Sequence, residues 1–335
     1  GSLDNVGAIE GAQKIREYLY QLHKPNHDVK IIDLGSIKAG NILNDTYFAL
    51  KESVSFLIRQ NIVPIIIGGS QDLTYGVYLA YAQLEQTANL VSIDSKFSLG
   101  DTDDSINSEN YFSKILLHQP NALFNYSNLT YQSYFVDQKE LNLIDELFYD
   151  IHRLGVIKND IKLAEPVLRN ADFVSFNLRA IAQQFSPAHA NPSPNGLTAE
   201  QACQLSRYAG MNDKLSSFGI YDFNPTLDFR DTSAHLVSQM IWYFIEGFYQ
   251  RKSDFPIATK NSYTKYTVTI DDGKQELVFY KSPKSDRWWM EVPYHFSMFK
   301  KYERHLMLPC QYSDYEAALK NELPERWFQT FKKLK

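Results

Sequence analysis

Short apolar segments alternate with longer segments of helical periodicity through about residue 250, and this alternation constrains the fold more than any other feature of the sequence. Strands that are buried on both faces of a parallel sheet read as near-continuous apolar runs. The pattern therefore predicts an α/β fold, a three-layer α-β-α domain built on a mostly parallel sheet. The predicted strands are 29–34, 63–67, 90–94, 172–177 and 217–223.

Long helices are predicted between these strands. Apolar residues recur every three or four positions over 46–60 and 138–154, which is the spacing of one buried helix face. A third helix is predicted over 232–249, where a Thr-Ser pair offers a cap. These apolar stripes indicate core packing of the helices on the sheet.

After about residue 255 the pattern changes to antiparallel alternation, with turns at 271–273 and 282–286. We therefore divide the chain into an α/β domain over 1–255 and a C-terminal aromatic-rich β-meander with a helical tail over 256–335. A unit this small needs something to pack against. Its own α/β domain is one candidate, and a protein partner or a second copy is the other.

Composition and charge exclude several classes of function. Lys and Arg total 34 against 39 Asp and Glu, with no basic tract, so we expect no nucleic-acid partner. No apolar run approaches the roughly 18 residues that span a bilayer, so we expect no membrane association. Cys203 and Cys310 lack metal-type spacing and suit a reducing compartment, which predicts a cytoplasmic protein. The chain opens with Gly1-Ser2, which suggests a natural start further upstream.

Polar residues follow four of the predicted strands at the point where each strand ends, which is where parallel sheets place their sites. In order and spacing these segments resemble the ureohydrolase family, which comprises arginase, agmatinase and formimidoylglutamase. The Pro- and Gly-rich loop 186–198 and the segment 5–16 are also similar to that family. The four segments are 68–73 (Gly-Gly-Ser-Gln-Asp-Leu), 94–98 (Asp-Ser-Lys-Phe-Ser), 177–179 (Asn-Leu-Arg) and 222–225 (Asp-Phe-Asn-Pro).

The resemblance implies a two-manganese site that activates water for attack on a guanidinium or formimidoyl carbon. The family builds this site with Gly-Gly-Asp-His, Asp-Ala-His-x-Asp and Ser-x-Asp-x-Asp. Among the corresponding positions of this chain, only Asp94 has the residue type that binds metal in the family. The six corresponding positions are Gln71, Asp94, Lys96, Ser98, Asn177 and Arg179.

Lys96 and Arg179 therefore put two side-chain cations where the resemblance places two metal ions. Asp222 falls on the acidic position of the family that often faces the cationic group of a substrate. Because a buried carboxylate without a partner is costly, we expect Asp94 to pair with Lys96 or Arg179. We expect the pocket to hold no metal or other cofactor.

These substitutions favour a non-catalytic binding or assembly protein on a ureohydrolase scaffold. A small anion is the expected ligand, held by Lys96 and Arg179, with Asp72, His189 and Asp222 as further pocket candidates. We also expect a homo-oligomer or a protein partner bound through 256–335.

The alternative is an active, manganese-dependent hydrolase of C–N bonds in guanidino or formimidoyl substrates. It requires a rearranged metal site, for which the nearest residues are Asp72, Asp94, Asp101 and His189. Uptake of manganese by the folded protein distinguishes the two hypotheses, because a ligand that binds only the folded state raises its stability.

Overall fold

The structure is a computed structural model that describes residues 5–25, 30–256, 260–294 and 302–334. The chain forms two compact units. The first comprises Gly1–Leu141 and Ile151–Arg251, and the second comprises Asn142–Asp150 and Lys252–Lys335.

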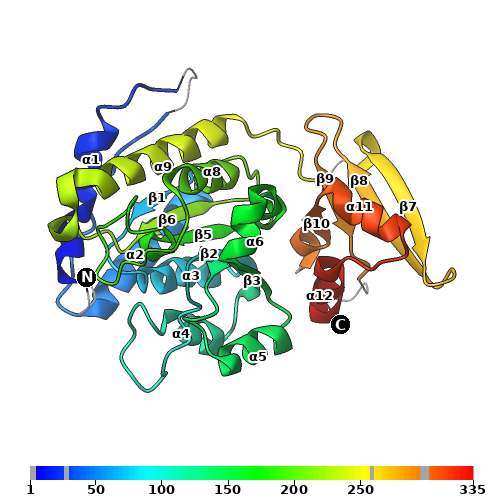
Figure 1. The fold of residues 1–335 in the computed structure, drawn as a ribbon, viewed down its shortest axis with the longest axis horizontal. Helices are drawn as coiled ribbons and strands as arrows, with labels where there is room; N and C mark the ends of the chain where they lie inside the picture. The colour runs from blue at the N-terminus through cyan, green and yellow to red at the C-terminus, as the bar shows by residue number, and fades with distance from the viewer. Residues whose placement is uncertain (1–4, 26–29, 257–259, 295–301, 335) are drawn as a thin grey trace. The chain divides into compact units, whose positions relative to one another are not determined.

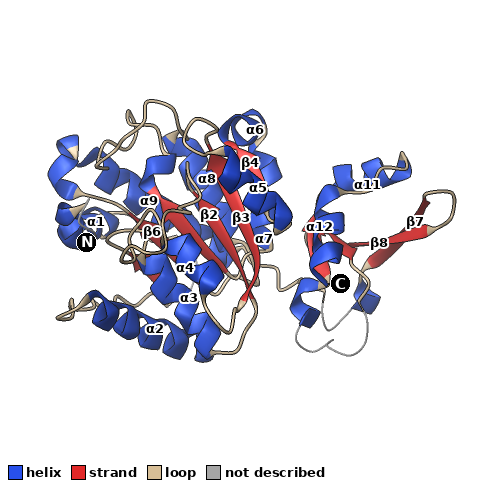
Figure 2. Cartoon of the chain, turned by 90° about the horizontal axis from the view of Figure 1, so that it is seen from below, coloured by secondary structure: helices blue, strands red, loops and turns tan. Residues whose placement is uncertain are grey.

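The first unit is built on a six-stranded sheet with the order β1-β6-β5-β2-β3-β4. Figure 2 shows β2 and β3 side by side in this sheet. The pairings β1–β6, β6–β5, β5–β2 and β2–β3 are all parallel. This arrangement confirms the predicted α/β class. The strands are β1 (Ile65–Ile67), β2 (Ala88–Ile93), β3 (Leu123–Tyr131), β4 (Asp150–Arg153), β5 (Phe173–Asn177) and β6 (Ser217–Tyr221).

Helices cover both faces of this sheet and make the three layers (Figure 1). One face carries α1 (Gly11–Leu19), α8 (Ala199–Gly210) and α9 (Thr232–Tyr249), and the other carries α2 (Leu43–Arg59), α3 (Leu73–Gln83) and α4 (Tyr111–Leu117). The connections after β3 and β4 add α5 (Gln138–Glu146), α6 (Leu154–Asn159) and α7 (Ala164–Arg169). No helix of the described residues is long and apolar enough to cross a membrane.

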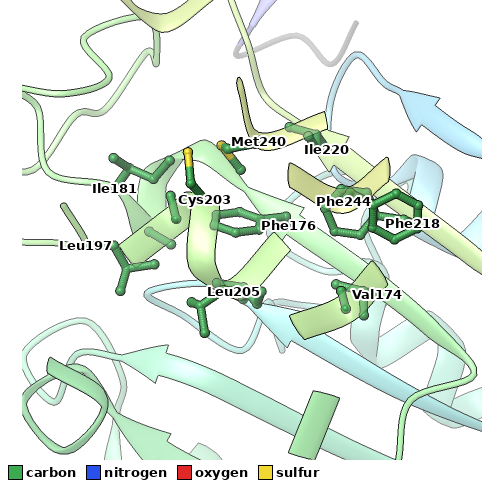
Figure 3. Close-up of a cluster of buried hydrophobic side chains, with 14 of the residues drawn as sticks. Val174, Phe176, Ile181, Leu197, Cys203, Leu205, Phe218, Ile220, Met240 and Phe244 are labelled. Carbon is green, nitrogen blue, oxygen red and sulfur yellow. The ribbon is translucent and has the colours of Figure 1, made fainter. Parts of the chain in front are cut away.

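The core between the sheet and the α8–α9 layer is formed by alternate strand residues (Figure 3). Phe176 of β5 lies beside residues of α8 and α9, and the ring of Phe218 stacks on Phe244 of α9 with 4.5 Å between centroids. The two helices approach closely at Gly210, where an added Cβ would lie 2.1 Å from the carbonyl oxygen of Phe244. Glycine is therefore required at this crossing.

The second unit contains an antiparallel sheet with the order β10-β9-β8-β7. This confirms the C-terminal meander and adds β10 as a fourth strand. Trp327 of the last helix is buried, and its Nε1 donates to the carbonyl of Glu291 at 2.9 Å. The elements are β7 (Thr264–Ile270), β8 (Gln275–Lys281), β9 (Trp288–Glu291), β10 (Met307–Cys310), α11 (Tyr312–Leu319) and α12 (Glu325–Leu334).

The predicted first strand, 29–34, is wrong over 30–34, and residue 29 lies outside the described residues. Residues 30–34 form neither helix nor strand, and the side chain of Leu34 is 70% exposed. Arg16 of α1 donates to both carboxylate oxygens of Asp33, at 2.8 and 3.2 Å, and to the carbonyl of Gly35. Side-chain contacts to α1 hold this segment, whereas a strand requires a neighbouring backbone.

The predicted helix over 138–154 is also wrong in its second half. The helix α5 ends at Glu146, Phe148 takes a left-handed conformation with φ +54°, and the chain enters β4 before α6 begins. The apolar spacing of this segment fits a helix, but its residues 150–153 form the last strand of the sheet. A sheet neighbour satisfies the backbone hydrogen bonds there, and local periodicity cannot reveal that neighbour.

Candidate functional site

The carboxyl ends of β1, β6, β5 and β2 meet at one edge of the parallel sheet. Gly68 directly follows β1, and a Cβ at this position would lie 2.3 Å from the ring of Tyr221, so only glycine fits. The carbonyl of Gly69 accepts a hydrogen bond from the backbone of Asp222 at 2.7 Å. These contacts bring the segments that follow the strands into one place.

Arg179 and Asp94 form an ion pair at this edge. Arg179 Nε donates to Oδ1 of Asp94 at 2.6 Å, and Nη2 donates to Oδ2 at 3.0 Å. The side chains are 6% and 0% exposed. Burial by itself lowers the pKa of Arg179, but the nearby carboxylates, Asp94 first, raise it above its ordinary value. The expected pairing of Asp94 with one of the two cations is confirmed, and the partner is Arg179.

Lys96 pairs with a residue that the sequence did not single out. Its Nζ lies 3.0 Å from Oε2 of Glu109, and the other oxygen of Glu109 accepts from Nη1 of Arg179. Glu109 therefore bridges the two cations. Burial raises the pKa of Glu109, but Arg179 and Lys96 outweigh that effect and hold it below its ordinary value. Several acids lie in this loop, and no spacing distinguishes Glu109 from its exposed neighbours.

Asp222 lies at the end of β6 in a left-handed conformation, φ +67°, and is buried. Asn177 Nδ2 donates to Asp222 Oδ2 and to Oε1 of Gln71, both at 2.7 Å. Burial raises the pKa of Asp222 to about 7, although the positive charge of Arg179 acts in the opposite direction. Two of the six predicted metal-site positions, Gln71 and Asn177, thus form a neutral amide network with Asp222.

Three further predicted residues, Ser98, Asp72 and Asp101, lie in three different places. Ser98 Oγ accepts from Nη2 of Arg179 at 2.8 Å, so it belongs to the ion-pair cluster. Asp72 is buried against the hydroxyls of Tyr47 and Ser70, and burial raises its pKa. Asp101 is exposed and caps its own loop through the backbone of residue 103 at 2.9 Å.

His189 lines the cavity beside Arg179 and is 8% exposed. Its Nδ1 accepts from the backbone of Asn191 at 2.9 Å, which assigns the proton of the neutral ring to Nε2. Burial, assisted by the charge of Arg179, lowers the pKa of His189 to about 4. At neutral pH this histidine is an uncharged hydrogen-bond donor toward the cavity.

These groups surround a cavity of about 260 Å³. Asp94, which is fully buried, lies behind the lining. Across the described residues, no group of three or more His, Cys, Asp or Glu side chains has an arrangement that could hold a metal ion. The lining residues are Asn5, Lys96, Ser108, Glu109, Arg179, His189, Ala190, Asn191 and Asp222.

A parallel sheet between two helical layers, with polar residues gathered at its carboxyl end, defines an open α/β protein with its site at that edge. The chain belongs to the arginase family, whose model, described as "Arginase family", matches residues 2–246. The resemblance carried by the four strand ends is thereby confirmed.

Curated relatives of the chain are formimidoylglutamases. The one from Staphylococcus haemolyticus is 24% identical over 253 residues, which cover 72% of this chain and 79% of that protein. The one from Streptococcus gordonii is 26% identical over 263 residues, covering 72% of this chain and 78% of that protein.

Solved structures agree with this fold. The crystal structure of Trypanosoma cruzi formiminoglutamase with Mn²⁺ superposes with a TM-score of 0.67 at 20% identity, over 73% of this chain and 87% of that one. The arginase of Bacillus subtilis gives 0.61 at 17% identity, over 71% and 92% of the two chains.

Proposed function

We propose that this arginase-family protein is a non-hydrolytic binding protein, in which an internal ion-pair cluster replaces the metal centre of the family. One observation carries the proposal: the guanidinium of Arg179 contacts both oxygens of the fully buried Asp94 carboxylate. Asp94 is the one position of the six where this chain keeps the ligand of the family, and that carboxylate is engaged by a permanent cation.

The residues present do not fit a pair of manganese ions. Divalent manganese prefers carboxylate and imidazole ligands, whereas the six corresponding positions offer two amides, a hydroxyl and two cationic side chains around one carboxylate. A divalent ion on Asp94 would also lie beside the buried guanidinium of Arg179, and like charges in a low-dielectric site repel strongly.

The charges of the cluster balance without an ion. Asp94 and Glu109 carry two negative charges, and Arg179 and Lys96 carry two positive ones. A cavity lies next to these residues, so the chain has space for a ligand beside the six corresponding positions. A small anion remains the ligand that these two cations favour.

Hydrolysis through a rearranged metal site is the alternative suggested by the formimidoylglutamase relatives. It needs Asp72, Asp94, Asp101 and His189 to converge on a metal. Asp72 is held by Tyr47 and Ser70, and Asp101 is exposed in its loop. The relatives favour this alternative, whereas the positions of Asp72 and Asp101 do not. Contact of 256–335 with a protein partner or a second copy, and a cytoplasmic location, stay predictions.

Metal content tests the proposal directly. The protein is purified without chelator, and its manganese, iron and zinc are measured by plasma mass spectrometry before and after incubation with excess manganese and desalting. The Staphylococcus haemolyticus formimidoylglutamase, handled in parallel, is the comparison protein. We expect no retained metal and no rise of Tm with manganese. About two equivalents of bound metal per chain would overturn the proposal.

A further inference from the structure

Glu109 is a half-exposed carboxylate in the lining of the cavity. Its side chain is 45% exposed, while Arg179, which it contacts, is 6% exposed. Lys96, its second partner, is 36% exposed. A half-exposed carboxylate thus pairs with a buried guanidinium that also pairs with the fully buried Asp94.

The backbone that carries Glu109 is held in place independently of its side chain. The carbonyl of Glu109 accepts from the backbone of Gly100 at 2.8 Å, and its own N–H donates to Oδ1 of Asn107 at 2.8 Å. Asn110 Nδ2 donates to the carbonyl of Asp101 at 2.9 Å. Rotation of the Glu109 side chain alone can therefore uncover the two cations without rearrangement of the loop.

We infer that Glu109 occupies the position of a ligand carboxylate, and that a small molecule with one carboxylate binds by displacing it from Arg179 and Lys96. This inference rests on the proposed function and specifies the ligand class of the same cavity. A ligand carboxylate can repeat the contacts that Glu109 makes, one oxygen to each cation.

The charge of the uncovered cluster favours a single negative charge. With Glu109 rotated away, the charges of Arg179, Lys96 and Asp94 sum to one net positive charge when Asp222 is protonated. A dianion such as phosphate would exceed this charge and would meet Asp94 behind Arg179. The volume of about 260 Å³ suits a molecule of amino-acid size, below the roughly 300–1,000 Å³ of drug-sized pockets.

The competition between Glu109 and the ligand gives a specific test. Glu109→Gln removes the charge and keeps the shape of the side chain, so an added carboxylate meets a weaker internal competitor. The matched control is Asp104→Asn, which removes the same charge from an exposed position of the same loop. Both full-length proteins and the parent are titrated with sodium acetate at about pH 6 by calorimetry, with sodium chloride keeping the ionic strength constant.

We expect Glu109→Gln to bind acetate at least tenfold more tightly than the parent, and Asp104→Asn to match the parent. Adding Lys96→Met to Glu109→Gln should weaken acetate binding about tenfold, because one of the two cations is lost. Acetamide, the neutral isostere of acetate, should bind to neither the parent nor any of the variants. Equal acetate affinity in the parent and Glu109→Gln, or an equal gain in Asp104→Asn, would overturn the inference.

Crystals of the parent soaked in acetate supply a second readout that does not depend on any variant folding. Acetate between Arg179 and Lys96, with the Glu109 side chain rotated away, would support displacement, and an unmoved Glu109 with no acetate on Arg179 would overturn it. Retained manganese would contradict the proposed function, which is therefore tested separately. A protein that binds neither acetate nor metal would contradict only the inference about a carboxylate ligand.

Discussion

Arg179 and Asp94 lie 85 positions apart in the chain and meet through two parallel hydrogen bonds, from Nε to Oδ1 at 2.6 Å and from Nη2 to Oδ2 at 3.0 Å. The loop after β5 supplies the guanidinium, and the loop after β2, the neighbouring strand, supplies the carboxylate. Both side chains are buried, so each supplies the opposite charge that the other needs.

Arg179→Met should therefore destabilise the protein strongly. It leaves the buried charge of Asp94 without its partner, which costs about 3–5 kcal/mol in comparable buried pairs. Asp94→Asn combined with Arg179→Met should recover part of this loss, because no unpaired charge remains. Urea unfolding at about pH 7 measures the free energies, and Lys51→Met, at a surface pair with Glu52, should cost no more than about 1 kcal/mol. A loss below about 1 kcal/mol in Arg179→Met would contradict the role of the pair.

Gly210→Ala should weaken the crossing of α8 and α9. The added methyl carbon would lie 2.1 Å from the carbonyl oxygen of Phe244 and 2.9 Å from the backbone nitrogen of Phe248, so the helices must separate. Overpacking of this kind costs about 1–3 kcal/mol. Gly155→Ala in α6 is the control, because a Cβ added there would have no atom within 4 Å, and it should leave stability unchanged or raise it by up to about 1 kcal/mol. Thermal unfolding of both variants checks the prediction, which equal Tm values would refute.

Asp222→Asn should change how stability depends on pH. Burial raises the pKa of Asp222 from 3.8 to about 7, so the folded state holds its proton more tightly than the unfolded state. The stabilisation that comes from holding this proton is fully present below about pH 4 and is lost as the pH rises to about 7. Above that pH the free energy of unfolding no longer changes because of Asp222. The size of this stabilisation is up to about 4 kcal/mol, from roughly 1.4 kcal/mol for each pKa unit.

The groups that act on Asp222 are Arg179, Asp94, Asp72 and Asn5, and all of them are retained in this variant. The free energy of unfolding of the parent, relative to Asp222→Asn, should fall between about pH 5 and 7 and then level. Urea titrations at each pH measure the difference. Parallel curves for the two proteins across this range would show that Asp222 does not titrate there.

Trp289→Ala should loosen the second unit. Trp289 is 1% exposed and packs with Tyr280 and Met307, and removal of a buried tryptophan costs about 3–5 kcal/mol. Limited proteolysis with mass spectrometry should show faster cleavage within 252–335. Tyr312→Ala is the control, because that side chain is 52% exposed, and its cleavage rate should stay near that of the parent. Identical cleavage of all three proteins would count against the predicted core.

Most sheet strands of the α/β unit are predictable from the sequence because they are apolar and short. The predicted strands 63–67, 90–94, 172–177 and 217–223 correspond to β1, β2, β5 and β6. The strand β3, which lies next to the edge strand β4, escapes prediction because Asn125, Ser127 and Asn128 interrupt its apolar pattern, although all three are buried. Buried polar residues of this kind are compatible with a strand only when tertiary neighbours satisfy them.

In the candidate site, too, some residues are predictable from the sequence and others are not. The residues after each strand are local features, so the sequence alone locates Arg179, Asp94 and Asp222 at one edge of the sheet. Glu109 has no such signal, since it lies in an irregular loop among other acids. Its role follows from the position of that loop against Lys96 and Arg179, which comes from the packing of separate segments.

By itself, the sequence determined the fold class and the strand ends that carry polar residues, because periodicity and residue identity are local properties. That five of six metal-ligand positions are replaced stays a prediction from the resemblance. Only the tertiary structure decided which carboxylate neutralises which cation, and that burial brings the pKa of Asp222 to about 7. The physical reason is that ion pairing and desolvation depend on distances between residues that are far apart in the chain.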